Sequence, residues 1–133
     1  MRDRVQRRWG RLINTLNTLS KAAIAGSAPT ALTRAAQRAL SKVLSKEGSP
    51  HNVRVNALRV ALSDPVNRLQ ARASGGPPLD TRTRKHSAGA QVTLGRIGEA
   101  PGLANVACIL ASDAASHVTG TAINVDAGLC PLI

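Results

Sequence analysis

Apolar residues recur at helical spacing in one long block of the chain. The block follows Ser27 and Pro29 and extends as far as Gly48. Because proline is tolerated in a first helical turn and glycine favours a helix end, the spacing predicts a helix over 28–48, stopped by Gly48 and by Ser49-Pro50. The apolar series comprises Leu32, Ala35, Ala36, Ala39, Leu40, Val43 and Leu44.

Shorter apolar runs on both sides of this helix are typical of buried strands. A second helix is predicted to open at Pro101, after which apolar residues again recur at helical spacing. The order strand, helix, strand, helix, strand is typical of right-handed parallel crossovers, so we expect an α/β fold. The strands are expected at 11–16, 51–58 and 121–126, the turn before the last strand at Thr119-Gly120, a loop at 21–28, and a charged helix end at 1–10 that Gly10 stops.

Periodicity fades between Ser63 and Gln91, where Gly-Gly-Pro-Pro at 75–78 and several arginines occur. A stretch of this length without regular structure is usually a lid, a linker or an unfolded segment. We therefore expect a single domain over 1–133 that carries a poorly ordered loop or lid region at 63–94.

Composition narrows the chemistry that this domain can perform. The chain has 133 residues, of which 43% are hydrophobic, and its only aromatic residue is Trp9. That apolar content is enough to bury a core and argues against disorder of the whole chain. The absence of Phe and Tyr leaves a core of small aliphatic residues, and it removes the phenol that many enzymes use as a proton donor.

The formal net charge of +11 comes mostly from arginine, with five arginines in the first eleven residues. Such an excess attracts polyanions, and a basic interaction or nucleic-acid-binding protein is therefore one alternative. However, one Trp cannot supply a series of stacking platforms, and no helix-turn-helix or zinc-finger signature accompanies the charge. We expect no specific nucleic-acid partner.

Cysteine and histidine positions argue against a disulfide scaffold or a metal site. Cys108 and Cys130 lie far apart, and His51, His86 and His117 share no ligand spacing. The longest apolar stretch, 106–111, is too short to span a bilayer, and no secretory signal is visible. Residues 1–28 have the composition of a mitochondrial transit peptide, but a cytoplasmic protein without membrane contact is the preferred interpretation.

Four motifs together resemble the carboxy-terminal half of the short-chain dehydrogenase/reductase (SDR) family. They are Trp-Gly-Arg-Leu-Ile-Asn at 9–14, Asn-Val-Arg-Val-Asn-Ala at 52–57, Gly-Arg-Ile-Gly-Glu at 95–99, and the string from Leu110 to Gly128. The resemblance implies a partial Rossmann-like parallel sheet with the last three strands and two long helices. Family members bind NAD or NADP at the carboxyl edge of such a sheet.

The same resemblance implies that no catalytic or cofactor-binding site is intact. Thr30 and Arg34 occupy the positions of the family's Tyr and Lys, and Asn17 occupies that of its Ser. Arg59-Val60 stand where a Pro-Gly pair usually follows the sixth strand. Arg34 could still contact a ribose, but the chain has no G-x-x-x-G-x-G turn for pyrophosphate. Asn14 and Asn56 are expected to cap strand ends, and Asp126-Ala-Gly to form a strand-ending turn.

These observations favour a truncated SDR relative that is catalytically inactive and that needs no cofactor or metal as an isolated chain. One alternative is an active NAD(P)-dependent short-chain oxidoreductase with an atypical site or with a site completed in an oligomer. As partners we expect a second copy of the chain or an intact SDR relative, bound through the helices at 1–10 and 28–48. Removal of the preceding strands should also leave the strand at 11–16 without one neighbour and expose an apolar edge.

Overall fold

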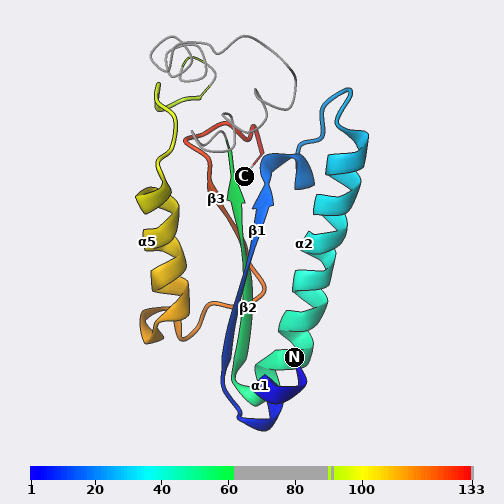
Figure 1. The fold of residues 1–133 in the computed structure, drawn as a ribbon, viewed down its shortest axis with the longest axis vertical. Coiled ribbons are helices and arrows are strands. Elements are labelled where there is room, and N and C mark those ends of the chain that lie inside the picture. Colours follow the sequence, from blue (N-terminus) through cyan, green and yellow to red (C-terminus); the bar gives the residue numbers. More distant parts are fainter. Residues whose placement is uncertain (62–89, 91, 133) are drawn as a thin grey trace.

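A computed structural model describes residues 1–61, 90 and 92–132, and it shows a parallel sheet with a long helix on each face (Figure 1). The α/β class predicted from the sequence is therefore confirmed. The helices are α1 (Arg2–Gln6), α2 (Ala28–Gly48) and α5 (Ala100–Ala111); the strands are β1 (Gly10–Asn17), β2 (Val53–Val60) and β3 (Ala122–Val125); short 3-10 turns cover Thr18–Ser20, Ser49–His51 and Asp113–Ala115.

The sheet has the order β1-β2-β3, and both strand pairs are parallel. The β1–β2 register runs from Gly10 opposite Val53 to Asn17 opposite Val60. Val60 in turn lies opposite Val125 of β3. The carboxyl ends of all three strands therefore meet in one row at the same edge of the sheet.

The end of α2 lies where the sequence predicts it, but for a different reason. Gly48 has helical dihedral angles, and a Cβ there would lie 2.8 Å from the carbonyl oxygen of Val53. Glycine is thus needed for the close approach to β2. Pro50 does not end the turn at once, because a 3-10 turn over Ser49–His51 tolerates it near its start. The left-handed residue that ends the turn is Asn52, with a φ of 56°.

The expectation that Gly10 stops the first helix is wrong. The helix α1 ends at Gln6, and Gly10 is the first residue of β1. A Cβ at Gly10 would lie 2.7 Å from Cδ of Arg4. This glycine therefore makes room for the aliphatic stem of an arginine that folds back onto the start of the strand.

The core is centred on β2, which is buried from its first residue to Arg59. It is the middle strand, and α2 and α5 cover its two faces (Figure 1). Leu58 packs with Leu110 and Ala115, and these three buried residues form the centre of the apolar cluster beneath α5. Partly buried aliphatic side chains complete it: Ile13, Leu103, Val106, Ala107, Val118, Ile123 and Val125.

The strand β1 is less covered than β2. It has β2 on one side, and the described part of the chain places no strand on its other side. Leu12 and Ile13 are accordingly only half-buried. The predicted open, partly apolar strand edge is thus present among the described residues.

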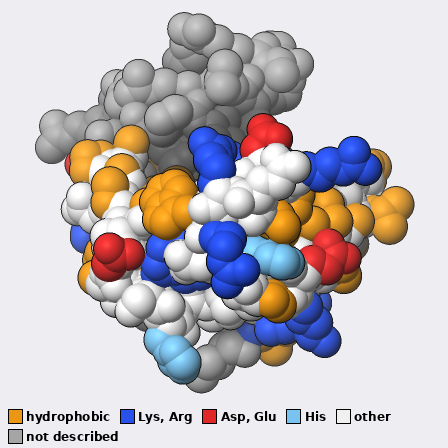
Figure 2. All heavy atoms as spheres, turned by 90° about the horizontal axis from the view of Figure 1, so that it is seen from below, with side chains coloured by type: hydrophobic (Ala, Val, Ile, Leu, Met, Phe, Trp, Pro, Cys, Tyr) orange, Lys and Arg blue, Asp and Glu red, His pale blue; other side chains and the backbone are white. Residues whose placement is uncertain are grey.

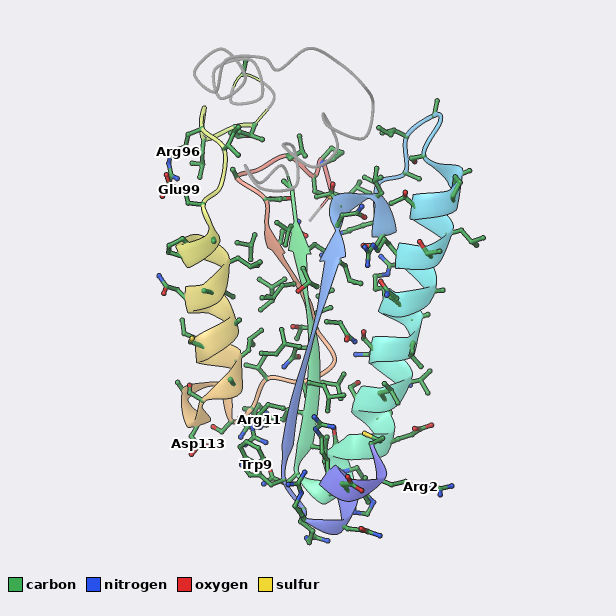
Figure 3. The ribbon with its side chains drawn as sticks, viewed as in Figure 1. Arg2, Trp9, Arg11, Arg96, Glu99 and Asp113 are labelled. Carbon is green, nitrogen blue, oxygen red and sulfur yellow. The ribbon has the colours of Figure 1, made fainter. Side chains whose placement is uncertain are left out.

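A small group of charges ties the amino ends of β1 and β2 to the end of α5. Asp113 Oδ1 forms ion pairs with Nη2 of Arg11 at 3.6 Å and with Nη2 of Arg54 at 3.3 Å. The Arg11 guanidinium also lies 4.9 Å from the ring centroid of Trp9, and Figure 3 shows these side chains together. The Asp113 side chain is 95% exposed, so solvent screens both pairs and their contribution to stability is small.

The remaining basic side chains do not form one continuous patch on the amino-end face. Figure 2 shows Lys and Arg side chains there in separate groups, interspersed with hydrophobic and acidic ones. In the described part of the chain, no helix has the length and apolar character needed to cross a membrane.

Most of the lid region expected at 63–94 lies outside the described residues. Of this region the structure describes 90 and 92–94. Val92 is buried, Leu94 N donates to the carbonyl oxygen of Ala127 at 3.2 Å, and Thr93 Oγ1 donates to that of Gly128 at 3.1 Å. The end of the region is therefore anchored to the segment that follows β3.

Candidate functional site

A cavity of about 540 Å³ opens at the carboxyl edge of the sheet; we call it the edge cavity. Open α/β sheets bind ligands at this edge, and the volume is within the range of small-molecule sites. Its walls come from the ends of β2 and β3, the start of α5 and the segment 92–96. Val60, Val92, Leu94, Leu103 and Val125 provide much of the apolar surface.

Asp126 is the one buried carboxylate among the described residues of the edge cavity, and both of its oxygens accept hydrogen bonds from the backbone. Asp126 Oδ1 accepts from N–H of Gly128, and Oδ2 accepts from N–H of Cys130, both at 3.0 Å. The predicted turn at Asp126-Ala-Gly is therefore confirmed, and this carboxylate holds the turn. The other charged lining residues are Arg96 and Glu99, which are exposed and lie ahead of α5 (Figure 3). Among the described residues that line it, the cavity thus offers an apolar wall but no buried acid or base that is free to move a proton.

Thr30 and Arg34, which the sequence predicts at the positions of the family's Tyr and Lys, lie in the first turns of α2. They are four residues apart and so share one face of the helix. Thr30 is exposed, and its carbonyl oxygen accepts from Oγ1 of Thr33 at 3.0 Å. Nη1 of Arg34 donates to Oε1 of Gln37 at 2.7 Å. Neither residue lines the edge cavity, so the structure does not bring this pair together with Val60 there.

Asn17, which the sequence predicts at the position of the family's Ser, is the last residue of β1. The register places it directly beside Val60 at the carboxyl edge. Its Oδ1 is buried and has no hydrogen-bond partner in the described part of the chain. Its carbonyl oxygen accepts from Oγ of Ser20 at 2.8 Å. Asn17 and Val60 are thus the two predicted site positions that the strand pairing makes neighbours.

Arg59 and Val60 are the last two residues of β2 and do not follow the strand as expected. Successive strand residues face opposite sides of a sheet, so the two separate: Val60 lines the edge cavity and Arg59 lines a cavity on the α2 side. Arg59 is 6% exposed, and its Nη2 donates to the carbonyl oxygen of Ala122 at 2.7 Å.

The cavity on the α2 side has a volume of about 470 Å³, and sequence reasoning missed it. We call it the basic pocket, because Lys21, Arg38, Lys42 and Arg59 line it. Arg38 and Lys42 are four residues apart and share one face of the predicted helix, which was the one indication of this pocket in the sequence. Lys21 and Arg59 are far from them in sequence, so no local pattern connects the four.

Asn14 and Asn56 do not cap strand ends, which corrects that expectation. Asn14 is within β1, and its Nδ2 donates to Oγ of Ser41 in α2 at 2.7 Å. Asn56 is in the middle of β2, where its Nδ2 donates to the carbonyl oxygen of Val118 at 2.9 Å. The strands use these amides to hold other segments. The described residues contain no cluster of metal-ligating side chains, and His86 lies outside them.

Residues 1–130 match a protein-family model described as Enoyl-(Acyl carrier protein) reductase. Among curated proteins, the chain is 29% identical to the 3-oxoacyl-[acyl-carrier-protein] reductase FabG of Aquifex aeolicus, over 97% of the chain and 48% of that protein. It is 28% identical to the NADPH-dependent reductase BacG of Bacillus subtilis, over 92% of the chain and 48% of that protein. The chain therefore spans about half the length of the curated relatives it matches.

Solved structures likewise match this chain over about half of their own length. The chain superposes on YwfH, an NADPH-dependent reductase involved in bacilysin biosynthesis, with a TM-score of 0.83 and 27% identity, over 98% of this chain and 50% of that one. The gluconate 5-dehydrogenase of Burkholderia cenocepacia, solved with NADP and tartrate, gives a TM-score of 0.80 at 25% identity, over 99% and 49%.

Proposed function

The chain belongs to the short-chain dehydrogenase/reductase family of oxidoreductases, and we propose that by itself it is a catalytically inactive member. The observation that carries this proposal is Thr30 at the position of the family's Tyr, in a sequence without any Tyr. The phenol donates and accepts the proton of the substrate carbonyl in the family. An aliphatic hydroxyl has no pKa near the operating pH, so it cannot replace the phenol as general acid.

Two further positions support the same conclusion. Arg34 keeps the positive charge of the family's Lys, but a guanidinium stays protonated and cannot relay a proton. In this chain it also donates to Gln37 within α2. Asn17 could donate a hydrogen bond to a carbonyl, but no phenol stands beside it to complete the transfer. The three departures affect the proton donor, its activating cation and the group that orients the substrate.

We expect no low-micromolar binding of NADH or NADPH to the isolated chain. The sequence contains no glycine-rich turn between a strand and a helix, whose N–H groups would hold the pyrophosphate. Titration calorimetry checks this, with the NADPH-dependent reductase BacG as the positive control. A low-micromolar Kd for either dinucleotide would contradict the proposal. It would support the alternative of an active oxidoreductase with an atypical site.

We further propose that a second copy of this chain binds through the helices at 1–10 and 28–48. The support is an unpartnered apolar stripe along α2, formed by Leu32, Leu40 and Val43. Their spacing places them on one side of the helix, where all three are exposed. Contiguous exposed apolar residues of this kind mark association surfaces.

Leu40→Glu should convert a dimer of this chain into a monomer, measured by light scattering after size exclusion. In a two-fold dimer the substitution buries two charges against apolar surface, so we expect the dissociation constant to rise at least about a hundredfold. Ile109→Glu is the matched control, since Ile109 of α5 is 56% exposed and Leu40 is 53% exposed. A monomeric wild-type chain, or equal disruption by both substitutions, would exclude this pairing.

A further inference from the structure

The basic pocket gathers positive charge in a way that the SDR reaction does not use. It lies between α2, β2 and the residues that lead into β3, on the opposite side of the sheet from the edge cavity. Its four cations come from three segments: Lys21 follows β1, Arg38 and Lys42 belong to α2, and Arg59 belongs to β2. None of the described residues that line it carries a carboxylate.

Arg59 is the cation that is hardest to explain without a ligand. It is 6% exposed, and one hydrogen bond is formed by Nη2 to the carbonyl oxygen of Ala122. Its Nε is buried and has no hydrogen-bond partner among the described residues. A buried guanidinium without an opposite charge is strongly unfavourable, because the carbonyl dipole replaces only part of its hydration. An anion in the pocket would supply the missing charge and the missing acceptor.

Two cations of α2 line the pocket and could contact the same anion. Arg38 and Lys42 are one helical turn apart and line one wall. Lys42 is held over the pocket because its Nζ donates to the carbonyl oxygen of Gly120 at 3.0 Å. The like charges that line this cavity repel each other. An anion bound between them adds attraction to each cation, and this attraction offsets the repulsion.

We propose that the basic pocket binds the phosphate group of a small molecule. Phosphate matches the site because it presents several acceptor oxygens and up to two negative charges to guanidinium and ammonium donors. The volume of about 470 Å³ leaves room for an organic group beside Ala35, Ala39 and Thr121. The pocket is concave and Trp9 does not line it, so it lacks the aromatic platform on which single-stranded nucleic acid stacks.

Titration calorimetry of the full chain with inorganic phosphate and with ribose 5-phosphate, at constant ionic strength, tests this proposal. We expect sub-millimolar binding of at least one of them, and a thermal midpoint that rises with ligand concentration. Arg38→Gln should weaken binding about tenfold, because it removes one charge-assisted contact and preserves helix propensity. Arg59→Gln should weaken binding at least as much. Arg2→Gln, an exposed arginine of α1 outside the pocket, is the matched control and should bind as wild type.

Each outcome of these titrations supports or overturns the proposed phosphate site. Tighter binding of ribose 5-phosphate than of phosphate identifies an ester as the ligand class, and equal binding identifies the free anion. Absence of binding by both probes overturns the proposal, as does equal weakening by Arg2→Gln, which would indicate diffuse attraction to a basic protein. If Arg59→Gln fails to fold, Arg38→Gln decides alone. These probes carry neither nicotinamide nor adenine, so their binding does not require a dinucleotide site.

Discussion

Leu58→Ala is expected to lower the free energy of unfolding by about 3 kcal/mol. Leu58 is 1% exposed and packs against Leu110 and Ala115 at the centre of the apolar cluster. Truncation removes the transfer free energy of the buried atoms and leaves a cavity, because the middle strand of a sheet cannot move inward to fill it. Urea denaturation followed by far-ultraviolet circular dichroism measures the change.

Leu132→Ala is the matched control for this substitution. Leu132 is exposed near the end of the chain, so its truncation should change the free energy of unfolding by less than about 0.5 kcal/mol. A loss of less than about 1 kcal/mol for Leu58→Ala would show that the cluster beneath α5 is not closely packed, in contrast to ordinary cores.

Asn56→Ala is expected to cost about 3 kcal/mol, through polar groups that lose their partners. The Asn56 amide is almost fully buried, its Nδ2 donates to the carbonyl oxygen of Val118, and its Oδ1 accepts from N–H of Thr121 at 3.3 Å. Alanine leaves a carbonyl and an N–H of the segment before β3 without these bonds. Asn56 therefore fixes the path by which the chain enters the last strand.

The control is Asn105→Ala on the exposed face of α5, where alanine is the better helix former and stability should be unchanged or slightly higher. Both variants are compared by denaturant unfolding and by amide hydrogen exchange at 118–122. Unchanged protection of these amides in Asn56→Ala would contradict the assigned role, whatever the global stability.

Much of this fold was predictable because the apolar periodicity marks where the helices and strands lie. The series from Leu32 to Leu44 lies within the true helix, although α2 buries Ser41, Ser45 and Gly48 and leaves Leu32, Leu40 and Val43 exposed. The alternation around Val53 and Val55 predicts the middle strand. The roles of Gly10 and Gly48 could not be read from sequence, because each makes room for atoms of another segment. Sequence shows that glycine is present, but not whether it serves a left-handed turn or a close contact.

The candidate site, like the fold, was only partly predictable from the sequence. The lack of a phenol was evident from one residue type, because the sequence contains no Tyr and no neighbour can restore that chemistry. The separation of Arg59 from Val60 was not evident, because it depends on where β2 ends. A shift by one residue in a strand moves a side chain to the opposite face of the sheet. The basic pocket required the register itself, which places Arg59 within reach of Ala122, the first residue of β3.

The parallel sheet also has a consequence for the order in which the chain acquires its structure. Gly10 pairs with Val53, 43 positions later, while Ala57 pairs with Ala122, 65 positions later. The shorter connection contains α2, so its helix brings the ends of β1 and β2 together, whereas the longer one closes at a greater entropic disadvantage. Folding dominated by such distant pairings is slow compared with that of helical bundles. We therefore expect the β1–α2–β2 unit to form first, and β3 to dock onto a strand that is already in place.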